Sequence, residues 1–160
     1  MTVDIIIPTY KPDETLCLLL HKLQGQTFVV HRVIILNTEE ELWKQAVAAY
    51  PIEQVLKELP CEYEVFHIAK KDFDHGGTRQ FGAEHSDADA MIFMTQDAVP
   101  ADRNLIGNLI RPLQENSKVG AAYARQLARE DCAYLEKYTR RYIRRWSTSR
   151  ISAFFIMERL

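Results

Sequence analysis

The sequence contains few cysteines, no long apolar run, no internal repeat and no low-complexity stretch. Its three cysteines, Cys17, Cys61 and Cys132, lie far apart and never form a Cys-x-x-Cys pair, which argues against a disulfide framework and against a zinc site. We expect them to be reduced residues of the packed interior. No window approaches the roughly 18 apolar residues that a membrane span needs, and the N-terminus does not resemble a signal peptide. We therefore expect a cytoplasmic protein.

The net charge of −2 hides an uneven distribution of charge along the chain. Residues 1–136 hold 13 lysines and arginines against 21 acids, whereas residues 137–160 hold seven against one. A basic end can contact phosphates, anionic lipids at the inner face of the cell membrane, or an acidic partner domain. A solvated helix face that pairs with the acidic body explains the same residues equally well. Nucleic-acid binding ranks last, because the body is acidic and no recognition motif is present.

Short β-branched runs alternate with segments of helical periodicity along most of the chain. A length of 160 residues, 47% of them hydrophobic, suits one compact domain. Parallel strands need crossover connections, so the alternation predicts an α/β domain with a mostly parallel central sheet and helices on both faces. The expected strands cover residues 3–7, 32–36, 63–68, 90–94 and 119–124. The expected helices cover residues 16–23, 42–49, 78–85 and 105–113, the first capped by Asp13 and ended by Gly25, the second ended by Pro51.

Ligands of such sheets bind at the carboxyl ends of the strands, which selects the loops at residues 8–12, 37–39, 72–79 and 95–102. The last of these opens with Thr95-Gln96-Asp97, directly after a buried strand. Mg²⁺ and Mn²⁺ prefer oxygen ligands and often share one or two carboxylates with substrate phosphates, so Asp97 and a diphosphate are chemically sufficient. Alternatively, Asp97 only caps a helix that begins near Asp102.

The loop at residues 72–79 contains adjacent glycines, Gly76 and Gly77, before a predicted helix. Glycines allow close backbone approach to an anion, whose charge the helix N-terminus and Arg79 would favour. His75 can donate a hydrogen bond to a phosphate. The alternatives are a tight turn for the glycine pair and an ordinary surface histidine.

The first two loops offer groups that suit a nucleoside. Pro8, Thr9 and Tyr10 supply backbone groups, a hydroxyl and an aromatic face, although an ordinary turn with a surface tyrosine explains them too. Asn37 and Glu39 are candidate hydrogen-bond partners for a base or ribose. The acids that begin at Glu39 are also typical of a helix start.

The chain resembles family 2 glycosyltransferases, and within them the rhamnosyltransferase-like branch, over about residues 3–150. The resemblance rests on four segments in this order: Ile5–Tyr10, Val33–Thr38, His75–Gln80 and Phe93–Asp97. It implies a Rossmann-like GT-A fold and a metal-dependent, inverting enzyme that uses Mg²⁺ or Mn²⁺. Such an enzyme transfers a sugar, with rhamnose among the candidates, from a nucleoside diphosphate to a glycan or lipid-linked acceptor in cell-surface polysaccharide synthesis.

The resemblance also implies roles for particular residues. The first two loops would bind the nucleotide, and the glycine-rich helix start would lie near the diphosphate. Asp97 would be the final acid of a D-x-D metal motif, and Gln96 beside it would contact the nucleotide sugar. Thr95 replaces the first acid of that motif, a form that occurs in the rhamnosyltransferase-like branch. Asn37 stands where many relatives have Asp.

The catalytic base that family members carry is not recognisable. Glu130-Asp131 has suitable residue types, but it follows Arg125 too closely and lacks the preceding apolar strand. We therefore expect a donor-binding domain over residues 1–131, the start of an acceptor-binding part over residues 132–160, and truncation beyond it. The alternative is a catalytically inactive nucleotide-sugar-binding fragment or module.

The basic tail also carries an aromatic pattern. Tyr138, Tyr142 and Trp146 alternate with arginines and predict a helix with one aromatic stripe, whereas residues 152–160 begin no recognisable unit. Amphipathic helices bury their apolar face, so we expect this stripe to pack on a further segment or to drive self-association.

Overall fold

A computed structural model describes residues 1–124 and the backbone of residues 155–158. Its sheet has the order β3-β2-β1-β4-β6-β5. Parallel pairing joins β1 (Val3–Tyr10) to β2 (Arg32–Thr38) and β4 (Ala90–Phe93), and β2 to β3 (Glu62–Ile68). Strand β6 (Phe155–Glu158) runs antiparallel between β4 and β5 (Ala121–Ala122). The predicted mostly parallel sheet is confirmed.

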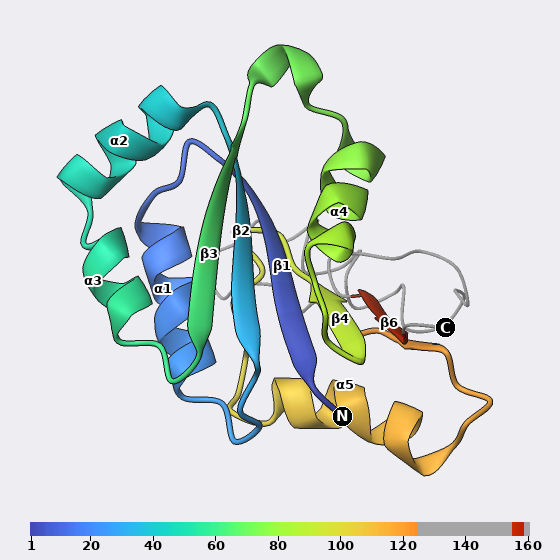
Figure 1. The fold of residues 1–160 in the computed structure, drawn as a ribbon. Coiled ribbons are helices and arrows are strands. Elements are labelled where there is room, and N and C mark those ends of the chain that lie inside the picture. Colours follow the sequence, from blue (N-terminus) through green and yellow to red (C-terminus); the bar gives the residue numbers. More distant parts are fainter. Residues whose placement is uncertain (125–154, 159–160) are drawn as a thin grey trace, which may run out of the picture.

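Helices cover both faces of the sheet, as expected (Figure 1). One face carries α1 (Glu14–Gln24), α2 (Glu40–Ala49), α3 (Ile52–Lys57) and α5 (Leu105–Glu115), and the other carries α4 (His75–Glu84). Successive side chains of a strand point to opposite faces. Accordingly, Ile5 and Ile7 pack toward α1 and its neighbours, whereas Ile6 packs toward α4. Both faces of the central strands are therefore buried.

The first helix forms where the sequence predicts it. The Asp13 side chain caps it by accepting a hydrogen bond from the Thr15 N–H at 2.9 Å, and Gly25 follows its last residue. Its periodic leucines, Leu16, Leu19, Leu20 and Leu23, are all buried. Local spacing and capping thus determine this element.

Strands β1 and β2 are longer than the sequence predicts. Pro8, Thr9 and Tyr10 continue β1, and Asn37 and Thr38 continue β2, so these residues are not in loops. A proline inside a strand usually costs a ladder hydrogen bond. Ile6 accepts from Met94 N on the β4 side. Because bonding sides alternate along a parallel strand, Pro8 faces that same side, beyond the last paired residues of the two strands, Ile6 and Phe93.

Several other boundaries differ from the prediction. Pro51 ends α2 but also precedes a separate short helix, α3, whose Ile52, Val55 and Leu56 are buried. The last predicted strand shrinks from residues 119–124 to Ala121–Ala122, and the unassigned end of the chain supplies β6. Long-range burial and pairing, which local periodicity does not record, decide these elements.

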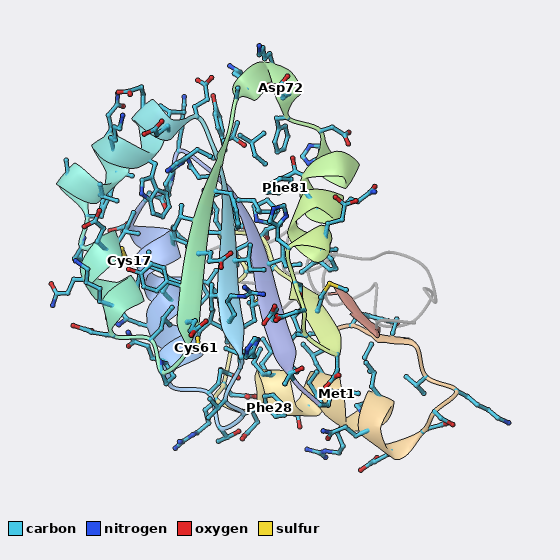
Figure 2. The ribbon with its side chains drawn as sticks, in the orientation of Figure 1. Met1, Cys17, Phe28, Cys61, Asp72 and Phe81 are labelled. Atoms are coloured by element: carbon cyan, nitrogen blue, oxygen red, sulfur yellow. The ribbon has the colours of Figure 1, made fainter. Side chains whose placement is uncertain are left out.

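Cys17 and Cys61 are free thiols, as expected; Figure 2 shows Cys61 at the start of β3. Burial, with a contribution from the charge of Asp4, raises the pKa of the Cys61 thiol to about 11. No helix in the described part of the chain is long and apolar enough to cross a bilayer. The predicted aromatic helix, Glu130-Asp131, Cys132 and the division at residue 131 lie outside the described residues.

Helix α4 approaches the sheet closely at Gly82. A Cβ atom there would lie 2.7 Å from Ile6 Cγ2 and 2.8 Å from Leu36 Cδ1, and both side chains are fully buried. Ile6 Cγ2 can move only by rotation about χ1, which is restricted for a β-branched side chain packed in the core. Gly82→Ala should therefore lower the free energy of unfolding by about 1–3 kcal/mol through overpacking.

Gly107→Ala in α5 is the matched control for urea denaturation. Its Cβ would make only an ordinary 3.9 Å contact with Phe28. Alanine at a helical position with room for it stabilises by about 0.4–1 kcal/mol, so this variant should be as stable as the parent or more so. Equal stability of the two variants would contradict the close approach.

Candidate functional site

A row of polar side chains crosses the carboxyl ends of three strands. Thr9 of β1 is in register with Asn37 of β2, which is in register with His67 of β3. These residues follow the apolar positions that face α1 and α2, so the row lies where that core ends. Polar groups replace apolar ones at this edge of the sheet.

Asn37 is the centre of this row and is fully buried. Its Oδ1 accepts from the Thr9 hydroxyl at 3.3 Å, and its Nδ2 donates to the Glu39 carbonyl oxygen at 2.9 Å and lies 3.1 Å from His67 Nδ1. An amide nitrogen only donates, so His67 Nδ1 accepts. The Asn37 side chain thus has partners for all its hydrogen-bonding groups inside the protein.

This network holds the backbone at the β2–α2 junction. Glu39 adopts a left-handed φ of 69°, a conformation that costs free energy in residues other than glycine. Its N–H donates to the Ile68 carbonyl at 2.8 Å, and its own carbonyl accepts from Asn37. Both backbone groups of Glu39 are therefore committed, and only its half-buried side chain is free to meet a ligand.

The neighbouring row faces the other side of the sheet and differs in character. Tyr10 is in register with Thr38, and the tyrosine is 41% exposed. Thr38 is only 3% exposed, and its hydroxyl has no hydrogen-bond partner among the described residues. Buried polar groups are nearly always paired. A buried hydroxyl without a described partner thus lies next to an exposed aromatic ring at this edge of the sheet.

Gln96 joins the loop after β4 to the end of β1. Its Oε1 accepts from Tyr10 N at 2.9 Å, and its Nε2 donates to Tyr10 O at 3.2 Å. The side-chain amide thereby continues the β1–β4 ladder beyond the last strand residue, Phe93. This contact holds the Thr95–Asp97 segment against Tyr10.

Asp97 is exposed at the carboxyl end of β4. Its carboxylate has no hydrogen bond or ion pair within residues 1–124. Helix α5 begins at Leu105 after Asn104, so Asp97 does not cap it, and that alternative is wrong. The carboxylate is free to bind a cation.

The glycine-rich segment is helical rather than a loop. Helix α4 begins at His75, which places Gly76 and Gly77 in its first turn. The Asp74 carboxylate caps that turn by accepting from Gly77 N. Arg79 Nη1 donates to the His75 carbonyl at 2.8 Å. Asp74 and Arg79 therefore make intrachain contacts at this helix start, and an anion would have to compete with the Asp74 carboxylate.

A second charged cluster lies at the opposite, amino edge of the sheet. Ligand atoms of Asp4, His31 and Asp87 lie within 4.8 Å of one another and could hold a metal ion. Arg32 already pairs with Asp4 at 3.3 Å and with Asp87 at 2.8 Å. Burial alone lowers the pKa of Arg32, but these carboxylates outweigh it and raise that pKa. The guanidinium supplies the positive charge that a metal would otherwise bring.

Two residues of the carboxyl edge, Thr38 and His67, are not among the candidates that the sequence indicates. Thr38 falls within a predicted turn, but it belongs to β2. The period of two along β2 and β3 contained a signal for His67, since it places that residue on the same face as Asn37. No local pattern indicates that the Thr38 hydroxyl lacks a partner.

Comparison with known proteins decides the family. The profile described as glycosyl transferase family 2 matches residues 4–157. The chain belongs to glycosyl transferase family 2. The O-antigen chain rhamnosyltransferase RfbN of Salmonella typhimurium is 32% identical to it over 143 residues, which are 89% of this chain and 42% of RfbN. The chain therefore spans less than half the length of that curated relative.

Solved structures of glycosyltransferases share the fold. The mannosyltransferase PcManGT of Pyrobaculum calidifontis, in complex with GDP-Man and Mn²⁺, has a TM-score of 0.64 at 14% identity and covers 98% of this chain and 44% of its own. Glucosyl-3-phosphoglycerate synthase of Mycobacterium tuberculosis, in complex with UDP, has a TM-score of 0.62 at 12% identity and covers 98% and 56%. The family and the Rossmann-like GT-A fold expected from the resemblance are confirmed.

The Asn37 network predicts a strong response to replacement of this amide by an acid. In Asn37→Asp, a buried carboxylate would face the Glu39 carbonyl oxygen and could no longer donate to it. Loss of this donor and burial of a charge should lower the free energy of unfolding by about 2–4 kcal/mol at neutral pH.

The same substitution at Asn104 is the control in thermal and urea unfolding. Asn104 is exposed and precedes α5, where a negative charge is favourable, so Asn104→Asp should change stability by no more than about 0.5 kcal/mol. If Asn37→Asp is no less stable than Asn104→Asp, the network does not hold this edge.

Proposed function

We propose that this family 2 chain binds the sugar donor of an inverting glycosyltransferase. The donor is a nucleoside diphosphate sugar, and the acceptor is a glycan or lipid-linked molecule in cell-surface polysaccharide synthesis at the cytoplasmic face of the membrane. Rhamnose is the first candidate sugar, because the curated relative is a rhamnosyltransferase. The division into a donor-binding domain over residues 1–131 and a tail over residues 132–160 belongs to this proposal.

One observation carries the proposal. An exposed Tyr10 ring, the unpaired hydroxyl of buried Thr38 and the free carboxylate of Asp97 come together at the carboxyl ends of β1, β2 and β4. The Gln96 amide ties the last of these segments to the first. An aromatic face, a polar group and a metal-binding acid are complementary to a base, a ribose and a diphosphate, respectively.

The residues at this edge fit a divalent cation. Asp97 offers a hard oxygen ligand from a segment held in place by Gln96, and Mg²⁺ or Mn²⁺ would complete its coordination with phosphate oxygens and water. Thr95 can contact the ion only through a neutral hydroxyl or a water molecule. When bound, the ion would neutralise charge on the leaving diphosphate. The Asp4, His31 and Asp87 cluster fits less well, because Arg32 already pairs with both of its carboxylates.

The chain's own residues would then bind and orient the donor. Tyr10 and Thr38 would hold the nucleoside, and the segment from His75 to Arg79 would lie toward the diphosphate. In direct displacement, a base removes the proton of the acceptor hydroxyl as that oxygen attacks the sugar carbon and the diphosphate leaves. We assign no residue of this chain to that base.

The first test concerns the metal. In Asp97→Asn, the amide cannot supply an anionic ligand, so Mn²⁺ should no longer strengthen binding of uridine, guanosine or thymidine diphosphate in calorimetry. Asp87→Asn is the matched control, because it removes an acid of the amino-edge cluster by the same change. It should leave the Mn²⁺ effect intact. Loss of the effect in Asp87→Asn alone would move the metal to the amino edge and overturn the assignment of Asp97.

The second test separates folding from binding at Thr38. Thr38→Val keeps the shape of the side chain and removes an unpaired buried hydroxyl, so the free energy of unfolding should stay equal or rise by up to about 1 kcal/mol. Affinity for the nucleoside diphosphate that binds best should fall about threefold to tenfold. Thr2→Val, at the opposite end of the sheet, is the control for binding. Unchanged affinity in Thr38→Val would exclude this hydroxyl from the site.

A product assay separates the enzyme from its alternative. Release of nucleoside diphosphate from the donor in the presence of a glycan acceptor would support a transferase. Tight donor binding without release would favour a catalytically inactive nucleotide-sugar-binding module.

A further inference from the structure

The segment at residues 94–104, which carries Asp97, contains no helix or strand. It follows β4 at the carboxyl edge and ends at α5, which Figure 1 shows at the end of the sheet where the chain begins. The segment thus runs from one edge of the sheet to the other. Among the described residues, its hydrogen bonds with other elements lie at its two ends.

A glutamine side chain anchors the segment at each end. At the carboxyl edge, the Gln96 amide bonds to the end of β1. At the amino edge, the anchor is Gln26 in the loop between α1 and β2. Its Nε2 donates to the carbonyl oxygens of Asp102 at 2.9 Å and Lys22 at 3.1 Å, and its Oε1 accepts from Ile106 N at 3.2 Å. The whole amide of Gln26 is therefore used to join α1, the segment and α5.

Gln26 also takes the place of a local helix cap. Asn104 precedes α5, but its side chain makes no capping bond. The first N–H groups of a helix have no partner within it, so the bond from Ile106 N to Gln26 satisfies one of them. Thr27 adds bonds from its N–H and its hydroxyl to the Arg103 carbonyl oxygen, at 2.8 Å and 3.1 Å. The loop before β2 therefore holds the start of α5 and the chain that leads into it.

Only residues 97–101 lie between the two glutamine anchors. Ala98 and Pro100 are buried, whereas Asp97 is exposed. The Ala98 N–H donates to the Thr95 carbonyl oxygen at 3.0 Å, which closes a turn around Asp97. The Asp97 carboxylate therefore belongs to a short stretch of chain that is fixed at both ends.

Such restraint matters most where one carboxylate must hold an ion. Thr95 stands where the first acid of the metal motif is expected, so Asp97 would be the sole charged protein ligand. A ligand on a loosely held segment must be ordered when the ion binds, and this ordering costs affinity. A side chain that fixes the segment can therefore strengthen metal binding without contact with the ion.

We propose that Gln26 is a positioning residue for Asp97, because it fixes the far end of the segment that presents this carboxylate to the metal ion. This inference rests on the proposed function, which assigns the metal to Asp97. It gives the loop between α1 and β2, at the amino edge of the sheet, a role in a site at the carboxyl edge.

The test replaces Gln26 by methionine, which keeps the length of the side chain and removes its hydrogen bonds. Calorimetry would measure the affinity of Gln26→Met and of the unchanged chain for the best-binding nucleoside diphosphate, with and without Mn²⁺. With Mn²⁺, we expect affinity to fall about threefold to tenfold, because the Asp97 segment must then be ordered on binding. Without Mn²⁺, the change should stay below about twofold.

Gln24→Met is the matched control. Gln24 ends α1, and its Nε2 donates to the Val55 carbonyl oxygen at 3.1 Å, so it ties the same helix to α3. The substitution removes a comparable bond between distant segments but leaves the Asp97 segment anchored. Gln24→Met should therefore lower stability about as much as Gln26→Met and leave the Mn²⁺ effect unchanged.

Hydrogen exchange followed by NMR gives a second readout that needs no ligand. The N–H groups of Ala98 and Val99 donate within the turn at Asp97, each at 3.0 Å. They should exchange faster in Gln26→Met than in the unchanged chain, and no faster in Gln24→Met, because only the first change frees this segment. If Gln26→Met does not fold, Thr27→Val takes its place in both measurements. It removes the hydroxyl bond to Arg103 and keeps the backbone bond.

The outcomes separate this inference from the proposed function. If Mn²⁺ does not strengthen binding in the unchanged chain, the metal site and the role of Gln26 are both overturned. If Mn²⁺ strengthens binding equally in the unchanged chain and in the anchor variant, only the role of Gln26 is overturned. An equal loss of the Mn²⁺ effect in Gln24→Met would also overturn it, since general loosening of the fold would then explain both variants.

Discussion

The parallel register of β1, β2 and β3 is the constraint on which the rest of the carboxyl edge depends. Both faces of β1 and β2 are buried, so a slip of one residue would turn the apolar rows of Ile5, Ile34 and their neighbours toward the wrong core. The same register that fills the two cores places Thr9, Asn37 and His67 in one row and Tyr10 and Thr38 in the next. Packing therefore determines which polar side chains meet.

Where a strand ends, the backbone of its neighbour loses its hydrogen-bond partners. At the carboxyl edge of this sheet, side chains take their place. Strand β4 stops at Phe93, four residues before the corresponding end of β1, and the Gln96 amide satisfies the backbone of Tyr10 in place of a strand. At the β2–α2 junction, the Asn37 amide donates to the Glu39 carbonyl, which also accepts from the Leu42 and Trp43 N–H groups. A buried polar group without a partner costs about as much as a lost hydrogen bond, which explains why the fully buried Asn37 amide bonds within the protein.

The two ends of β1 differ in how their charges are balanced. At the amino edge, the buried Asp4 is neutralised by Arg32, which also reaches Glu64 and Asp87. At the carboxyl edge, the exposed Asp97 carboxylate has no such partner within residues 1–124. Balanced charges stabilise a fold locally and leave little for a ligand, whereas unbalanced ones attract it. The electrostatics thus agree with the rule that ligands bind at the carboxyl ends of parallel strands.

The sequence by itself determined the family, the alternation of strands and helices, and elements such as α1, because leucine spacing, the Asp13 cap and short motifs are local in the chain. It did not determine where β1 and β2 end, the separate helix α3, or the return of Phe155–Glu158 as β6. Among the site residues, Asn37 and Gln96 were expected to face a ligand, yet their amides bond to the protein, while Thr38 is left with an unpaired hydroxyl. Only the tertiary structure decided this, because the hydrogen-bond partners of each polar group come from segments distant in the sequence.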